Sequence, residues 1–192
     1  VTGRWAILDE LVCFDMGVVR FSELLRGVIR KSYSNFDVQI YGDPAGDFRS
    51  QTDERTPFQI MRNNGLKAIP APSNDPALRV EAVDVTLQRL IDGKAGFLLD
   101  KKCVNLKKGF NGGYHYRRLQ TSGDRYDEKP FKNRYSHVHD ALQYLMMGAG
   151  EGRTILSGKS RSQPIIAKKE WDVFAGQKKK TRKVWDLFKR NI

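Results

Sequence analysis

An imidazole and a carboxylate lie three residues apart where a loop leads into an apolar helix. His137 and Asp140 are one helical turn apart after Ser136, so their side chains share a face. Together they form a hard ligand pair for a divalent cation near the positive end of the helix. Ser136 is predicted to be the N-cap, and an acid in the first turn after such a cap also has a purely structural use, so that role for Asp140 stays open.

A second carboxylate follows a short apolar stretch. Val38 and Ile40 predict a buried strand that ends at Gly42, and Asp43 comes next, held extended by Pro44. In α/β proteins, functional groups collect beyond the carboxyl ends of strands. Asp43 is therefore a candidate metal ligand, and the alternative is an Asx-turn within the Asp-Pro-Ala-Gly segment.

Taken together, these two segments resemble the nuclease domain of tailed-phage terminase large subunits. The specific part is the helix start Lys-Asn-x-Tyr-Ser-His-x-x-Asp-Ala-Leu-x-Tyr over 132–144, preceded by Gly-Asp-Pro-Ala-Gly over 42–46. The resemblance covers about residues 1–150 and implies an α/β fold, an RNase H-like mixed sheet flanked by helices. It also implies that Asp43 and Asp140 are the second and third acids of a catalytic metal site, with His137 beside the metals.

The function implied by the resemblance is cleavage of DNA during viral genome packaging. A metal-dependent endonuclease would cut double-stranded DNA concatemers with little sequence preference, using two Mg²⁺ or Mn²⁺ ions about 4 Å apart held by carboxylates. The implied partners are double-stranded DNA, the terminase ATPase region, the small subunit and the portal protein. The implied setting is the cytoplasm of a phage-infected or prophage-carrying bacterium.

The first acid of such a site has no clear counterpart. An RNase H-like domain opens with three antiparallel strands, the first of which carries a catalytic Asp. Here only one strand, 4–12, is predicted before the first helix at 21–33. The core is therefore predicted to lack its first two strands. Asp9 and Glu10 fall on opposite sides of the strand, and we expect solvated acids there rather than metal ligands.

The middle of the chain alternates helix and strand signals. A short helix is predicted over 57–64, a strand over 66–69, a helix from Asp75 to about residue 92, and a strand over 97–99. Such alternation favours a mostly parallel sheet with right-handed crossovers. Residues 113–127, which combine Gly, aromatic and Arg side chains, favour a hairpin near the mouth of the site.

Positive charge is concentrated toward the C-terminal end of the sequence. The 192 residues carry a formal net charge of +12; residues 151–192 hold 12 Lys/Arg against 4 Asp/Glu, a net of +8, which leaves +4 for residues 1–150. We therefore divide the chain into a core, 1–150, and a basic, aromatic-containing tail, 151–192. The basic tail is suited to phosphates, and the resemblance suggests the portal as its partner. Val184, Leu187 and Phe188 predict a short amphipathic helix. A solvated tail is the alternative.

Cations near the helix motif are candidate contacts to the DNA backbone, which position a duplex without reading its sequence. These are Lys132, Arg117, Arg118 and Arg134. His139 falls on another face of the helix and is predicted to be structural or solvated.

The two cysteines and the hydropathy pattern indicate the redox compartment and whether a membrane is involved. Cys13 and Cys103 have neither zinc-ligand nor disulfide-framework spacing, which favours a reducing cytosol, and both are predicted to be small buried residues. No apolar run reaches membrane-spanning length, so no membrane partner is expected.

Two other interpretations stay open. One is another RNase H-like nuclease or a transposase relative, because those also place acids on two strands and a helix. The other is a non-catalytic fragment that binds DNA or the portal. In that case two carboxylates without a third leave one metal position underfilled, and cleavage is weak or absent.

Overall fold

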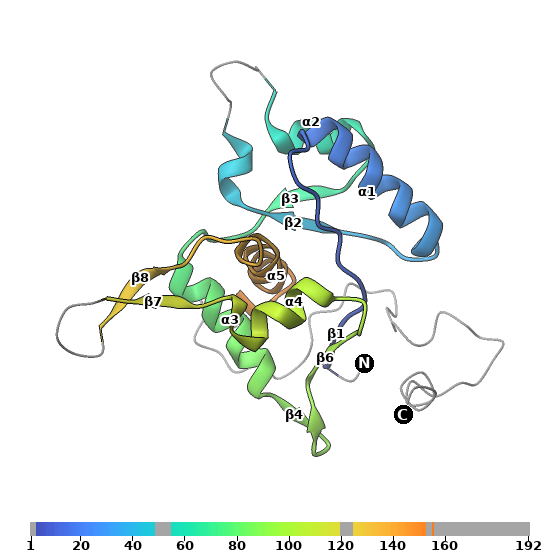
Figure 1. The fold of residues 1–192 in the computed structure, drawn as a ribbon. Helices are drawn as coiled ribbons and strands as arrows, with labels where there is room; N and C mark the ends of the chain where they lie inside the picture. The colour runs from blue at the N-terminus through green and yellow to red at the C-terminus, as the bar shows by residue number, and fades with distance from the viewer. Residues whose placement is uncertain (1–2, 49–54, 120–124, 153–154, 156–192) are drawn as a thin grey trace.

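The computed structural model describes residues 3–48, 55–119, 125–152 and 155, and these form a mixed α/β structure (Figure 1). The described residues hold five α-helices, two short helical turns and eight short strands. The strands are joined in four separate two-stranded pairs. None of the helices in this part of the chain is long and apolar enough to cross a membrane.

Two of the four strand pairs are parallel. β1 (Trp5–Ile7) pairs with β6 (Phe97–Leu99), and β2 (Ile40–Gly42) pairs with β3 (Ala68–Pro70). The prediction of a mostly parallel continuous sheet is therefore too strong, because the described strands do not join beyond pairs. The strand predicted over 4–12 is also wrong in length, since only three residues of it pair. The coarse α/β class is confirmed, whereas an RNase H-like sheet is not.

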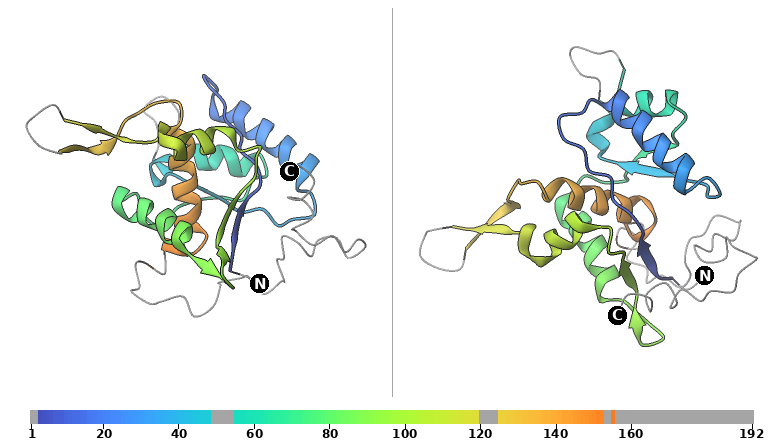
Figure 2. Two further views of the ribbon diagram at one scale, coloured as in Figure 1. Left: turned by 60° about the horizontal axis from the view of Figure 1, so that its bottom comes forward. Right: turned by 45° about the vertical axis from the view of Figure 1, so that its right-hand side comes forward.

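The other two strand pairs are antiparallel hairpins. β4 (Leu90–Ile91) pairs with β5 (Lys94–Ala95), and β7 (Tyr116–Arg118) pairs with β8 (Tyr126–Pro130). The second pair confirms the hairpin predicted around 113–127, and it projects from the body of the molecule in every view (Figures 1 and 2).

The first hairpin overturns the predicted length of the third helix. α3 (Pro76–Gln88) stops before residue 92, because Asp92 and Gly93 both adopt positive φ, 54° and 70°, between β4 and β5. Two such residues make the turn that closes a two-residue hairpin. Leu90 is consequently 71% exposed and does not lie on a buried helix face.

The helix starts follow their capping residues. Asp75 accepts hydrogen bonds from the backbone N–H groups of Ala77 and Leu78, which confirms it as the N-cap of α3. Thr56 and Gln59 form a reciprocal capping box at the start of α2 (Pro57–Asn63). The remaining helical elements are α1 (Val18–Ser32), η1 (Pro44–Asp47), α4 (Val104–Lys108), η2 (Gly109–Gly113) and α5 (Ser136–Gly148).

Helix α5 is the centre of the molecule. Figure 1 shows it end-on, with α1, α2, β2 and β3 on one side and α3, α4, β1 and β6 on the other. It packs against α3 and β2, and its Leu142, Met146 and Met147 are core residues. Gly148 allows β2 to approach closely, because a Cβ at this position would lie 2.1 Å from Cδ1 of Tyr41. The side chains of α5 therefore face elements that are distant in the sequence.

The core extends past the predicted boundary at residue 150. Glu151 is buried; its carboxylate accepts two hydrogen bonds from the Arg89 guanidinium and one from the Trp5 indole. Ile155 also packs on the core. The rest of the basic tail, with the helix predicted around 184–188, lies outside the described residues.

Candidate functional site

The first turn of α5 is organised by Asn133 rather than by Ser136. The Asn133 side-chain oxygen accepts hydrogen bonds from the backbone N–H groups of Tyr135 and Ser136, at 2.8 and 3.2 Å. Ser136 is the first residue inside the helix, and its buried hydroxyl donates back to the Asn133 carbonyl. The predicted Ser136 N-cap is therefore wrong, because an Asx-type turn three residues earlier already holds this end. Asp140 is not needed for a capping box.

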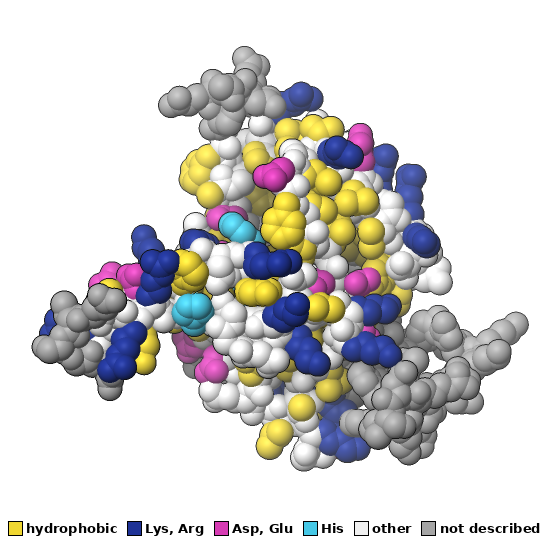
Figure 3. Space-filling model, in the orientation of Figure 1, with side chains coloured by type: hydrophobic (Ala, Val, Ile, Leu, Met, Phe, Trp, Pro, Cys, Tyr) yellow, Lys and Arg dark blue, Asp and Glu magenta, His cyan; other side chains and the backbone are white. Residues whose placement is uncertain are grey.

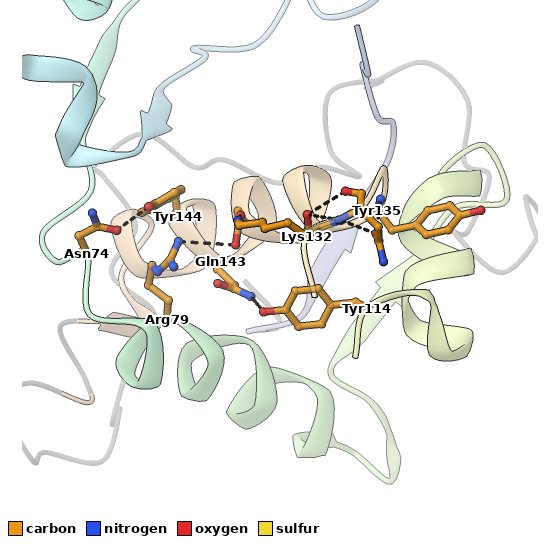
Figure 4. Close-up of polar contacts among 10 residues, drawn as sticks. Asn74, Arg79, Tyr114, Lys132, Tyr135, Gln143 and Tyr144 are labelled. Carbon is orange, nitrogen blue, oxygen red and sulfur yellow. Dashed lines mark hydrogen bonds and ion pairs between the residues drawn. The ribbon is translucent and has the colours of Figure 1, made fainter. Parts of the chain in front are cut away.

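Asp140 is instead held by two cations from different parts of the chain. Lys132 Nζ lies 2.6 Å from Oδ2 of Asp140, and Arg79 Nη1 lies 3.8 Å from Oδ1; Figure 4 labels the two cations. The Asp140 side chain is 16% exposed, so the carboxylate is at the edge of the interior. A partly buried carboxylate gains more from neighbouring cations than one in bulk water does. Asp140 therefore lies between two cations and keeps part of its surface exposed.

Tyr144, one turn after Asp140, connects the two predicted acids. Its hydroxyl donates to Oδ1 of Asn74 at 2.6 Å, and the Arg79 guanidinium lies over its ring, 4.5 Å from the centroid (Figure 4). Burial raises the pKa of this hydroxyl, and the nearby Asp43 and Asp140 carboxylates raise it further. Asp43 and Asp140, 97 positions apart in the sequence, therefore share the surroundings of one tyrosine.

Asp43 lies at the end of β2 and begins η1. Its Oδ1 accepts a hydrogen bond from the Ala45 backbone N–H at 2.9 Å, which is the Asx-turn alternative foreseen for it. The side chain is exposed. One carboxylate oxygen thus fixes the turn while the residue stays beside Tyr144, so the capping role and a ligand role are compatible.

His137 lies on the first turn of α5 and is exposed. Within the described part of the chain it has no hydrogen-bond or ion-pair partner. Its role beside a metal therefore stays a prediction that rests on its spacing from Asp140.

A third carboxylate does not join this cluster. Both oxygens of Glu10 cap α4, accepting from the backbone N–H of Asn105 at 2.6 Å and of Leu106 at 2.9 Å. Asp9 lies near the Tyr33 hydroxyl instead. The expectation that Glu10 is a solvated acid is thus wrong, because the start of α4 needs an acceptor. Among the described residues no group of three His, Cys, Asp or Glu side chains is placed to hold a metal ion.

The chemistry of the donor set nevertheless fits a hard cation. Asp43, Asp140, Asn74 and Tyr144 present carboxylate, amide and hydroxyl oxygens, which Mg²⁺ and Mn²⁺ prefer. The Lys132 ammonium already contacts one of these oxygens, Oδ2 of Asp140.

The predicted backbone-binding cations lie on or beside the β7–β8 hairpin. Arg117 lies over the Phe131 ring, 3.8 Å from its centroid, and Arg134 lies 5.6 Å from that of Tyr135. Arg118 is exposed on β7, whereas Lys132 is engaged with Asp140. Figure 3 shows Lys and Arg side chains together with acids around this hairpin, at the left of the molecule. The surface there is charged but of mixed sign.

Of the two roles predicted for His139, structural or solvated, the structure shows the structural one. It is buried, its Nε2 lies 3.2 Å from the Leu106 carbonyl oxygen, and its ring stacks on Tyr114 with 4.8 Å between centroids. Burial lowers its pKa. Gly109 makes room for it, because a Cβ there would lie 1.9 Å from Nε2.

Sequence reasoning missed Arg79, Asn74 and the contact role of Tyr144. Tyr144 had a usable signal, since it follows Asp140 by four residues on the same helix. Arg79 and Asn74 had none, because they reach the cluster only through the packing of α3 against α5. Comparisons of this chain with protein-family models, with curated proteins and with solved structures found no match.

Proposed function

We propose that this chain is a metal-dependent DNA endonuclease module, the nuclease part of a viral DNA-packaging terminase. The supporting observation is that Asp43 directly follows β2, that β2 packs against the helix α5 carrying Asp140, and that both carboxylates raise the pKa of Tyr144. Two separate elements that each deliver a carboxylate to one place are what metal-assisted phosphodiester cleavage requires. The substrate proposed is double-stranded DNA, cut with little sequence preference.

The residues divide the proposed work between them. Asp43 and Asp140 would hold Mg²⁺ or Mn²⁺, with the Asn74 side-chain oxygen as a further donor, and the bound ion supplies an activated water and stabilises the leaving oxygen. Arg79 is fixed beside Asp140 and would neutralise charge that develops on the phosphate. His137 is exposed one turn before Asp140 and would orient water or accept a proton.

The cations of the β7–β8 hairpin would hold the duplex. Arg117 and Arg118 are on a projecting hairpin, where phosphate contacts fix the position of DNA without reading bases. This accounts for proposed cleavage without sequence preference. The terminase ATPase region, the small subunit and the portal protein remain partners implied by the resemblance.

A second function, DNA binding without cleavage, is favoured by one observation. Asp140 already has two cationic neighbours, and the described residues supply two acids where a two-metal site uses more. Under this alternative the Asp140 cluster is an ion-pair network that joins α3 to α5. The two functions differ in whether cutting depends on metal.

The deciding experiment is cleavage of supercoiled plasmid with Mn²⁺, Mg²⁺ or EDTA. Asp43→Asn and Asp140→Asn each remove a negative charge while keeping shape, and we expect cleavage to fall at least about 100-fold, because loss of a positioned ion costs several kcal/mol of barrier. Asp84→Asn is the matched control: among the described residues this exposed acid on α3 accepts a hydrogen bond only from Gln88 of its own helix, and the variant should cut normally.

The outcomes separate the proposals. Cutting by the unaltered chain in EDTA, or full cutting by Asp140→Asn, would refute the metal-dependent nuclease. Retarded migration of DNA without any cutting would favour the binding function.

A further inference from the structure

The two cations that contact Asp140 differ in how firmly they are held. Arg79 is 11% exposed, its guanidinium lies over the Tyr144 ring, and its buried Nε has no hydrogen-bond partner among the described residues. Lys132 is 64% exposed at its side chain and contacts Asp140 through its ammonium. Exposed Lys–carboxylate pairs are weak, because water competes for both charges. Arg79 is therefore a fixed neighbour and Lys132 a displaceable one.

The backbone that carries Lys132 is anchored beside the site. Asn133, the next residue, donates from its side chain to the Gly113 carbonyl at 2.7 Å and accepts from the backbone N–H of Ser136, the first residue of α5. Phe131, the preceding residue, donates its backbone N–H to the His115 carbonyl. A lysine between two anchored residues keeps its backbone in place while its long side chain changes direction.

We propose that Lys132 is a built-in competitor for the cation site at Asp140. Its ammonium occupies Oδ2 of Asp140 when no divalent ion is present, and an ion binds there only when the ammonium leaves. The proposal rests on the proposed function, since it takes Asp140 to be a metal ligand. The competition follows from charge and position, because a divalent ion and the ammonium would both be drawn to the Asp140 carboxylate, whose Oδ2 lies 2.6 Å from Nζ.

A displaced Lys132 would remain next to the site and be available to a phosphate. Because its backbone is anchored, the released ammonium stays within reach of Asp140 and of the β7–β8 hairpin that ends at Pro130. A DNA phosphate that draws Lys132 away would then favour metal binding, and bound metal would favour the phosphate. By linkage the two effects are equal in size. The site would bind metal best when DNA is present.

The test is the affinity for Mn²⁺ measured by titration calorimetry on the full chain, without turnover. Lys132→Gln removes the competing charge, and we expect Mn²⁺ affinity to rise about fivefold, the upper range for an exposed ion pair. Lys129→Gln is the matched control. It removes the same charge from β8, three residues away, without a described contact to Asp140, and should leave the affinity within about 1.5-fold.

Two further variants complete the test. Lys132→Arg keeps the charge, and we expect it to keep affinity close to that of the unaltered chain. A short duplex should raise Mn²⁺ affinity in the unaltered chain, and this gain should shrink in Lys132→Gln because the competitor is already gone.

The results distinguish this inference from the proposed function. If Asp140→Asn loses Mn²⁺ binding while Lys132→Gln matches Lys129→Gln, the competitor is refuted and the metal site stands. If Asp140→Asn binds Mn²⁺ as the unaltered chain does, or if the unaltered chain binds none, the metal site itself is refuted. A rise in Lys132→Gln that disappears in the Lys132→Gln, Asp140→Asn double variant supports the inference.

Discussion

Two carboxylates near the ends of α5 have opposite surroundings. Glu151, just past the helix, is 1% exposed, and the Arg89 guanidinium donates to both of its oxygens at 2.9 and 2.7 Å while the Trp5 indole adds a third bond of 2.6 Å. Asp140, near the start, has one exposed ammonium and a guanidinium at 3.8 Å. The Glu151 carboxylate is saturated with hydrogen-bond donors inside the protein, whereas the Asp140 carboxylate is not.

The difference lies in the donors, since both acids carry the same charge. The planar fork of Arg89 matches the Glu151 carboxylate in two parallel bonds, and this pairing raises the pKa of Arg89 further above its ordinary value. The Glu151 carboxylate therefore links three elements: β1, the end of α3 and the end of α5. Both of its oxygens are engaged, so neither is available to a ligand. Asp140 has looser partners, one of them displaceable. Donor geometry therefore separates a structural acid from a candidate ligand on one helix.

The largest predicted effect on stability comes from removing the Glu151 carboxylate. Glu151→Ala leaves the Arg89 charge partly buried without its partner, and we expect the free energy of unfolding to fall by about 3–5 kcal/mol. Urea unfolding followed by fluorescence of Trp5 and the other tryptophans measures this loss. Asp140→Ala is the contrasting variant, and its loss should be clearly smaller, because Lys132 is exposed and Arg79 lies 3.8 Å from the carboxylate rather than in two short parallel bonds. Equal losses in the two variants would contradict the distinction.

A smaller effect on stability is expected when β2, which leads into Asp43, is pushed away from α5, which carries Asp140. Gly148→Ala places a methyl group where Tyr41 of β2 already lies, at 2.1 Å, and overpacking of this kind costs about 1–3 kcal/mol. Because Asp43 directly follows β2, relief of the clash would move Asp43 away from Tyr144 and weaken Mn²⁺ binding. Urea unfolding and calorimetry report the two effects.

Gly27→Ala is the control for this variant. Gly27 lies in the interior of α1 with nothing within 4 Å of a Cβ, so alanine should stabilise the chain by about 0.5–1 kcal/mol through helix propensity. A Gly148→Ala variant that behaves like Gly27→Ala would show that β2 and α5 are not in close contact.

The mildest prediction needs no mutation at a charged residue. Burial raises the pKa of the Cys103 thiol to about 11, and nearby Glu10 and Asp100 add to the rise. At pH 8 only about one Cys103 in a thousand is then a reactive thiolate. We expect a disulfide reagent to label the half-buried Cys13 quickly and Cys103 only on opening of the core.

The same labelling sharpens the contrast between the acids. Glu151→Ala should speed the labelling of Cys103, because the hydrogen bonds of Glu151 to Arg89 and Trp5 stabilise the core. Lys132→Gln should leave the labelling rate unchanged. Equal labelling rates for Cys13 and Cys103 in the folded, unaltered chain would contradict the burial of Cys103.

Local sequence signals predicted local structure well and failed where a longer-range contact or a backbone turn intervened. Asp75 and the residue after it started α3 as expected, since a cap acts on the next few residues. The end of α3 was missed because Asp92 and Gly93 make a hairpin turn, which helical periodicity does not reveal. Asn133, and not Ser136, caps the start of α5, and Glu10 accepts hydrogen bonds from the start of α4.

The resemblance pointed to Asp43 and Asp140 as a pair to examine, whereas the sequence by itself determined the mixed α/β class and the starts of α2 and α3. It could do so because caps, turn residues and periodicity act over a few neighbouring positions. Only the tertiary structure decided that the two acids share Tyr144, that Arg79 and Lys132 hold Asp140, and that Glu10 belongs elsewhere. Partners of a charged side chain come from distant segments, and packing alone brings those segments together.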